Sequence, residues 1–454
     1  MKPLRTAVSA SSEVRSVHGL QLDVTAVLTF WMLLLYGINA RMVIPGFGAI
    51  GQPATLVALG ALLWWLSARC VPQLGMDQGH QPVRYALAVY ALYLTASYGM
   101  ASMRTLTALE RSSSTRGMIT LAALFGVAAL AADGIDSLDR LRGLLRRLVT
   151  FGALFAGFGL IQALVGESLL VLPPGLQWNA EIPADIEFRL GEIRPLATAL
   201  HPIEYAVVAA SLVPLAIHFV LYPSTRSDPV RAIIETSILL VAVFISLSRT
   251  GPLSLVVGLV VLAFGWTWRR RINVALVSLM VVPAIAAAVP WAYRVMVDMF
   301  TSGLDGSDYS VQARLDRLPQ IMALIRDRPL FGTGYGTLTP EEYLLIDNQL
   351  WGTLISIGFV GLVLTVGLVL TAGITAAQIR FRSAATAESM HLGRAIAGSI
   401  AAIGVSFATF DALFYRILVF TLFLLIGSAG ALWRLTGPAV APSPCSLGSK
   451  PAST

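Results

Sequence analysis

Charged residues, cysteine and histidine are scarce in this chain of 454 residues, and each shortage excludes a class of protein. Only 13% of the residues are charged, whereas a soluble domain carries about 25%, so a soluble globular protein is excluded. The two cysteines, Cys70 and Cys445, fall in segments expected in the cytoplasm, which argues against a disulfide or a cysteine-based metal site. No cluster of His, Cys and carboxylates has the spacing of metal ligands, so no metal ion or other cofactor is expected.

Acidic residues are outnumbered, 25 against 32 basic ones, and the net charge is +7. The arginines are spread over short connectors and form no basic face with interleaved aromatic residues, so nucleic acid is not expected as a partner. The excess of positive charge is better explained as the signal that sets membrane topology. Lys2, Arg5 and Arg15 precede the first apolar run without a cleavage site, which predicts a retained anchor.

Long apolar runs dominate what the sequence does contain, since 56% of the residues are hydrophobic. About twelve segments are long and apolar enough to cross the hydrocarbon core. We expect all of them to be helices, because an open sheet edge cannot satisfy its hydrogen bonds in lipid. The predicted fold is an all-α polytopic membrane protein whose spans are 23–40, 50–68, 85–103, 117–133, 148–166, 197–222, 232–248, 251–268, 272–292, 350–375, 395–413 and 417–434.

The arginine clusters at 140–147 and 269–271 predict that these connectors, and both termini, lie in the cytoplasm. Two longer connections then lie outside, and the longer one has too many aromatic and aliphatic residues for a disordered segment. We interpret it as a folded cap over a site at the membrane surface. The expected domains are a cytoplasmic tail 1–22, a membrane domain 23–436 with outer loops 167–195 and 293–349, and a disordered tail 437–454.

Arg249 interrupts an apolar stretch of the sequence, in "SLSRTGPL", where topology gives no reason for a charge. Gly251 and Pro252 follow it, so one helix is expected to end here and another to begin. One interpretation is an arginine that snorkels to mark the outer boundary. The other is a guanidinium held by Ser246 and Ser248 that offers its planar fork to phosphate oxygens in an internal cavity.

Arg194 is a second outer arginine, at the start of "RPLATALHPIEYAVVAA". The following proline favours a loop–helix junction, where Arg194 either contacts a phosphate or sugar or has a structural role. His201 and Glu204 come about two turns later. They are either a satisfied polar pair between helices or part of a binding site.

The loop 293–349 contains apolar residues at helical spacing in "ARLDRLPQIMALI", which predicts an amphipathic helix along the membrane surface. Arg314 and Arg317 lie on its polar face, where they contact either solvent and headgroups or a substrate. The sequence "GTGYGT" that follows is no nucleotide-binding loop, because no strand precedes it and no Lys-Ser/Thr follows. Gly334 and Tyr335 within it are candidate contacts of a phosphate or sugar, since glycine permits close backbone approach.

Asp347 and Asn348 stand immediately before the apolar run that begins at Leu350. Both residue types are favoured as helix N-caps. Alternatively, Asp347 accepts the proton of a sugar hydroxyl as a general base.

These segments occur in an order that resembles a known family. "SLSRTGPL", "IRDRPLFGTGYGT" and "DNQLWGTLISIGFVGLVL", together with "IRPLATALHPIEYAVVAA", are similar to motifs of the bacterial O-antigen ligase and polysaccharide polymerase family. The resemblance covers residues 190–370. It implies a lipid-carrier-dependent membrane glycosyltransferase of about twelve helices, similar in arrangement to the GT-C enzymes, in the bacterial inner membrane with its site facing the periplasm.

The resemblance also implies the chemistry. The donor would be a glycan on undecaprenyl diphosphate, the acceptor a glycan or lipid hydroxyl, and the reaction an inverting, metal-independent transfer. Arg194 and Arg249 would bind the diphosphate, with Arg314 assisting. Ligases of this family characteristically have His-Asn where this chain has Asp347-Asn348, which favours a polymerase of surface polysaccharide.

A ligase remains the alternative within the same class, and a lipid-glycan flippase is the alternative from another class. A chain-length regulator or a flippase is a candidate partner. The expected catalytic residues are Asp347, Arg249 and Arg194, and the expected substrate contacts are Arg314, Arg317, His201, Asn348, Gly334, Tyr335 and Ser248.

Overall fold

We describe the protein from a computed structural model, within which part of the chain is placed well enough to discuss. The described residues are 23–71, 79–179, 188–189, 192–223, 228–269, 271–273, 309–339 and 346–437, with single positions at 276, 287, 294, 297, 301 and 343. The predicted tail 1–22 lies outside them, as do the predicted tail 437–454 after its first residue and nearly all of the expected span 272–292.

Helices make up the architecture, and every expected span other than 272–292 coincides with one of them. Among the described residues, six helices (α2, α4, α5, α6, α12 and α14) are long and apolar enough to cross a membrane. The all-α membrane class is therefore confirmed, while the expected number of twelve spans stays a prediction. The helices are α1 Val24–Gly37, α2 Pro53–Cys70, α3 Pro82–Ser102, α4 Ala108–Gly134, α5 Leu138–Val165, α6 Pro202–Leu221, α7 Asp228–Ile245, α8 Thr250–Ala263, α11 Tyr309–Asp327, α12 Gln349–Ala377, α13 Ala387–Ser406 and α14 Arg416–Leu435, with 3-10 turns η1 Gly48–Ile50 and η3 Gln378–Phe381.

Strands in the described part of the chain are short and belong to the connections. Strand β1 (Met42–Val43) pairs antiparallel with β2 (Gln177–Trp178), so that Met42 lies opposite Trp178. Strand β3 (Phe188–Arg189) pairs with β4 (Glu192–Ile193) in the same way. The β1–β2 pair joins the segment after α1 to the connection after α5. The β3–β4 pair lies within the connection after α5.

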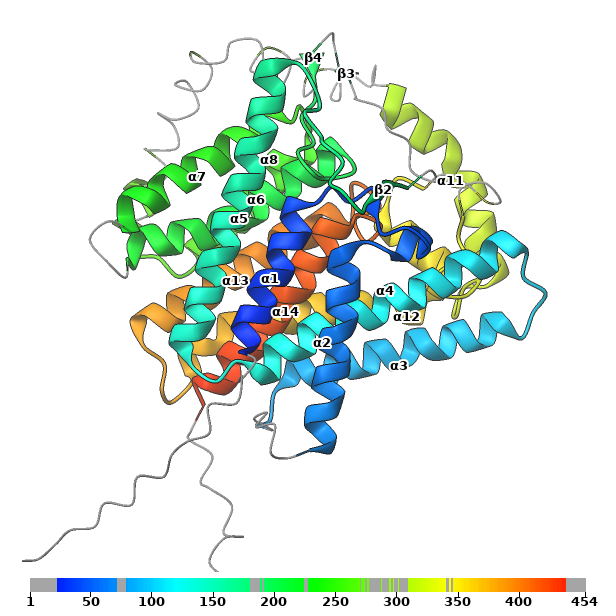
Figure 1. The fold of residues 1–454 in the computed structure, drawn as a ribbon, viewed down its shortest axis with the longest axis horizontal. Coiled ribbons are helices and arrows are strands. Elements are labelled where there is room, and N and C mark those ends of the chain that lie inside the picture. The colour runs from blue at the N-terminus through cyan, green and yellow to red at the C-terminus, as the bar shows by residue number, and fades with distance from the viewer. Residues whose placement is uncertain are drawn as a thin grey trace, which may run out of the picture.

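The bundle is arranged around two central helices. Figure 1 shows α1 and α14 at the centre, with α5, α6, α7 and α8 on one side and α2, α3, α4 and α12 on the other. Glycines allow the close contacts: a Cβ at Gly427 would lie 2.4 Å from the carbonyl oxygen of Ala128, and one at Gly126 would lie 2.6 Å from that of Ala58. Small residues at such crossings are typical of helices packed in membranes.

One end of the bundle, here named the loop-rich end, carries the described residues of the connections expected outside: 38–52, 103–107, 166–179, 192–201, 246–249, 328–339, 346–348 and 407–415. Hydrogen bonds join these connections across long sequence distances. Ala40 N donates to Thr198 O at 3.0 Å, Arg416 Nη1 donates to Gln52 Oε1 at 3.1 Å, and Leu413 N donates to a side chain at the start of α12. The connections expected outside therefore meet at one end.

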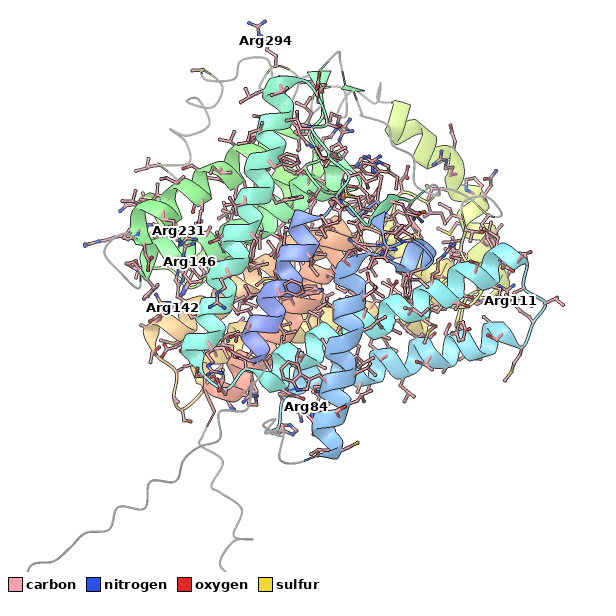
Figure 2. All side chains as sticks on the ribbon, in the orientation of Figure 1. Arg84, Arg111, Arg142, Arg146, Arg231 and Arg294 are labelled. Atoms are coloured by element: carbon pink, nitrogen blue, oxygen red, sulfur yellow. The ribbon has the colours of Figure 1, made fainter. Side chains whose placement is uncertain are left out.

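The opposite end carries arginines predicted from the sequence to lie in the cytoplasm. Asp133, buried at the end of α4, pairs there with Arg69 and Arg84 at 2.5 Å each and accepts a hydrogen bond from Trp65 Nε1 at 2.9 Å. Figure 2 shows Arg84 on this side of the molecule and Arg111, near the beginning of α4, at the far end of the same helix pair. The buried carboxylate is thus satisfied by several donors, as a charge in such a place requires.

Candidate functional site

Arg194 and Arg249 both lie at the junction between α7 and α8. Helix α7 ends at Ile245, and α8 begins at Thr250 with Arg249 in its N-cap position. The buried Arg194 side chain donates from Nε to the carbonyl oxygen of Ser246 at 3.3 Å. The two arginines proposed to bind a diphosphate therefore lie on one junction, although they are far apart in the sequence.

The backbone of this junction is strained at a non-glycine residue. Leu247 is fully buried and has φ = +52°, in the left-handed region that side chains other than glycine rarely adopt. Strain of this kind is stored where the surrounding structure holds a functional geometry. Ser246 donates from Oγ to Val243 O at 2.8 Å, so it contacts Arg194 through its backbone, and Ser248 is buried beside it.

His201 and Glu204 hold helix ends together. His201 is the N-cap of α6, and its Nδ1 accepts from Ile203 N at 3.0 Å. Glu204 is fully buried and accepts from Leu200 N at 2.9 Å and from Ile417 N, in the first turn of α14, at 2.8 Å. This geometry matches the interpretation as a satisfied polar pair between helices, and a substrate contact of His201 stays a prediction.

Asp347 and Asn348 have different roles at the start of α12. Asn348 is the N-cap: its Oδ1 accepts from Leu350 N at 2.9 Å and from Trp351 N at 3.2 Å. Asp347 therefore has no capping role. Its Oδ2 lies 3.7 Å from Arg317 Nη1 of α11, and 44% of the side chain is exposed.

The connection between α13 and α14, residues 407–415, is fixed to this helix start. Asn348 Nδ2 donates to Ala408 O at 2.8 Å, Gln349 N donates to Phe410 O at 3.1 Å, and Gln349 Oε1 accepts from Leu413 N at 2.7 Å. These bonds bring the half-buried Asp411 toward Asp347. Burial, followed by the negative charge of Asp347, raises the pKa of Asp411 to about 7.

Helix packing brings the Arg249 junction to the same side of the bundle as this connection. Helices α8 and α13 run antiparallel, because Gly258 packs against Gly398, whereas Gly265, two residues after the end of α8, packs against Arg394, earlier in α13. The start of α8 and the end of α13 are each eight residues from the Gly258–Gly398 contact. In two antiparallel helices, these two ends lie on the same side of that contact. The start of α8, which follows Arg249, therefore lies on the side of the bundle where α13 ends and residues 407–415 begin.

The glycine-rich turn 332–337 fills a break in α12. Gly358 has φ = +69° inside this helix, which interrupts the helical hydrogen bonds. Thr333 N donates to Ile355 O at 2.8 Å and Gly334 N to Ser356 O at 2.7 Å, so the turn takes the place of the missing helical donors. The glycines thus permit close approach to protein backbone, and the amide of Gly334 is used within the protein.

Tyr335 and the neighbouring residues anchor this turn to α3 and α4. Tyr335 N donates to Ser97 Oγ at 3.1 Å, and a Cβ at Gly334 would lie 2.3 Å from that of Ala101. A cavity of about 180 Å³ lies next to the turn and is bordered by Arg104 and Arg328. Sugar or phosphate contacts by Gly334 and Tyr335 stay predictions.

Helix α11 confirms the amphipathic helix expected in the long loop. Its apolar residue Ile321 packs with Ile346 and Ile355, while Leu324, Ile325, Leu338 and Trp351 surround them. The helix therefore rests on the start of α12, and Arg317 reaches Asp347 from it. Arg314 belongs to α11, but its side chain lies outside the described part of the structure.

Two charged residues at the loop-rich end escaped the sequence reasoning. Asp411 stands alone in "TFDALFYR", and its only signal is an acid between two apolar runs. Arg41 is buried beneath Trp178, with its guanidinium 5.8 Å from the ring centroid. Arg41 directly follows the expected span 23–40. An arginine at the predicted outer end of a span is the same signal that selected Arg194 and Arg249.

Taken together, these residues define a class of protein: a helical membrane protein with arginines and carboxylates gathered at one end of its bundle. Residues 236–366 match the family described as O-Antigen ligase. Over this stretch the chain is similar to the O-antigen ligase and polysaccharide polymerase family, whose members are glycosyltransferase-like membrane enzymes. The match contains Arg249, Arg317 and Asp347. No curated protein matches the chain.

Proposed function

We propose that the protein polymerises undecaprenyl-diphosphate-linked oligosaccharide repeats into a surface polysaccharide on the outer face of the inner membrane. The observation that supports this proposal is the position of Asp347, which has no capping role, lies 3.7 Å from Arg317 and is near Asp411 in the connection 407–415. A partly exposed carboxylate beside a guanidinium group suits the removal of a proton near a leaving diphosphate.

The reaction follows from these groups. An acceptor hydroxyl attacks the anomeric carbon of the donor, its proton passes to Asp347, and the bond from that carbon to the diphosphate oxygen breaks with inversion. The electron pair stays on the departing diphosphate, whose charge Arg249 and Arg194 neutralise. Arginine forks place two parallel donors on phosphate oxygens, so this mechanism needs no metal ion.

Polymerase is preferred over ligase because of residue 347. Ligases resembling this chain have histidine there, and this chain has aspartate. The acceptor in a polymerase is another lipid-linked glycan, so donor and acceptor both carry diphosphates that arginines can hold. The arginines at the loop-rich end, among them Arg41, Arg194 and Arg416, are candidate contacts of a second diphosphate.

The test is a reaction of the purified full chain with a defined lipid-linked donor. We expect products that lengthen by whole repeats, and loss of all product in Asp347→Ala. Matched control variants are Asp316→Ala, an exposed acid on α11, and Glu388→Ala, an acid at the opposite end. Transfer of single repeats to a different acceptor, without lengthening, would replace the polymerase by the ligase.

The flippase alternative predicts a different result. Vesicles loaded with outward-facing donor need no flipping. If the protein is a flippase, substitutions in it would therefore not reduce polymer assembly in these vesicles. If Arg249→Ala and Asp347→Ala both assemble normal polymer in such vesicles, the glycosyltransferase proposal is wrong.

A further inference from the structure

The beginning of α5 carries four arginines within residues 140–147, and they occupy two faces of the helix. Arg142 pairs with Glu388 at 2.7 Å, and Arg146 pairs with Glu235 of α7. Figure 2 shows Arg142 and Arg146 on the side of α5 that faces away from α1. On this face, each guanidinium has a carboxylate partner.

The other two arginines of this cluster, Arg140 and Arg147, lie two turns apart on the face of α5 that meets α1. The two helices run parallel, because Arg140 Nη1 lies 3.3 Å from Asp23 Oδ1 and Arg147 Nη1 donates to Thr29 Oγ1 at 3.0 Å. Asp23 also accepts from Thr25 N at 3.0 Å, so its charge is compensated.

Arg147 differs from its three neighbours in what it contacts. Within the described part of the chain, it has the hydroxyl of Thr29 as its hydrogen-bond partner and pairs with no carboxylate. The side chain is exposed, although Arg147 lies about two and a half turns into α5. Arg147 directly precedes the expected span 148–166, so this exposed arginine lies at the expected membrane surface, where a lipid phosphate can solvate it.

A cavity of about 400 Å³ opens between α1 and α5 at this position. Its polar part is formed by Arg147, Thr29 and Asp23, toward the helix beginnings. Farther along the helices it is lined by Phe30 and Leu33, which are 54% and 50% exposed, and by Phe151. A charged end at the membrane surface and an apolar wall along the hydrocarbon match a phospholipid headgroup with its acyl chains.

We propose that this groove binds an anionic phospholipid of the leaflet on the α1 N-terminal side, which the topology predicts to be cytoplasmic. Arg147 is the main ligand of the phosphate, and the side chains of Phe30 and Leu33 lie along an acyl chain. The uncompensated positive charge favours an anionic headgroup over a zwitterionic one. This binding site is separate from the loop-rich end and does not depend on the proposed reaction.

The test is native mass spectrometry of the purified full chain with equal amounts of phosphatidylglycerol or phosphatidylcholine. We expect the wild type to retain more phosphatidylglycerol, and Arg147→Gln to bind it about fivefold more weakly. Arg380→Gln is the matched control, because Arg380 is an exposed arginine at the same end, against Phe381 and away from the groove. This control should leave the retention of phosphatidylglycerol unchanged.

Three results would overturn the proposal. The wild type could bind both lipids equally, the two arginine variants could weaken binding to the same extent, or millimolar inorganic phosphate could displace the lipid. The last result would indicate a site for small anions. Melting temperatures in lipid-free detergent check that Arg147→Gln folds, which we expect because only its bond to Thr29 is lost.

Discussion

Asp411 provides the sharpest test of the site, because its charge state links stability to pH. Burial and the charge of Asp347 raise its pKa from 3.8 to about 7. Between these two values, the folded protein holds a proton that the unfolded chain releases. Stability therefore falls as the pH rises from about 4 to about 7.

The size of the effect follows from the same values. Each pH unit between the two pKa values is worth about 1.4 kcal/mol, which sets an upper bound of about 4 kcal/mol. Solvent reaches part of the Asp411 side chain, so screening reduces the expected loss to roughly 1–2 kcal/mol. The variant Asp411→Asn removes the titrating group, and its stability should change less between pH 4 and pH 7.

The assay is the thermal unfolding midpoint in detergent at several pH values, for the wild type, Asp411→Asn and Asp347→Asn. Asp347→Asn removes the second cause of the raised pKa, so its pH dependence should lie between the other two. Asp316→Asn, which removes an exposed acid on α11, should follow the wild type. The reasoning fails if Asp411→Asn keeps the wild-type slope, or if Asp316→Asn flattens it equally.

Four further outcomes are expected. Arg249→Lys should lose most transferase activity at normal protein yield, because a point charge does not replace a planar fork; near-normal turnover would remove Arg249 from the site. Asp347→Asn should abolish transfer with little change in melting temperature, whereas Asn348→Ala should destabilise the protein by about 1 kcal/mol as a lost cap, and equal melting temperatures would contradict this assignment. Gly336→Ala should lower the melting temperature, since its φ is +75° and its Cβ would lie 2.7 Å from Ser114 Cα, and an unchanged midpoint would count against the close packing. Activity should survive EDTA, and a loss that a divalent ion restores would overturn the arginine-based mechanism.

Apolar runs predicted the positions of the helices well and their boundaries less well. The span expected at 117–133 is part of α4, which begins at Ala108 because Thr107 and Glu110 form a capping box ahead of the apolar residues. A hydropathy window does not detect such a polar first turn of a helix. The break at Gly358 was also missed, because glycine inside an apolar run does not reveal the sign of its φ angle.

The candidate site was predictable where one residue carries its own signal, as an arginine in an apolar run does. Arg194 and Arg249 were found in this way, and the structure places them on one junction. The partners of such residues are set by packing between distant segments, so Asp411 beside Asp347 could not be read from the sequence. The sequence likewise did not reveal that the glycine-rich turn packs against α12.

Asp347 and Asn348 are adjacent but have different roles, and this affects which substitutions the site tolerates. Because Asn348, and not Asp347, caps the beginning of α12, the side chain at position 347 can be exchanged without the loss of this cap. A histidine or an aspartate at position 347 would then project from the same rigid support. Under the proposed mechanism, a protein with this arrangement can exchange its proton acceptor at little cost to folding.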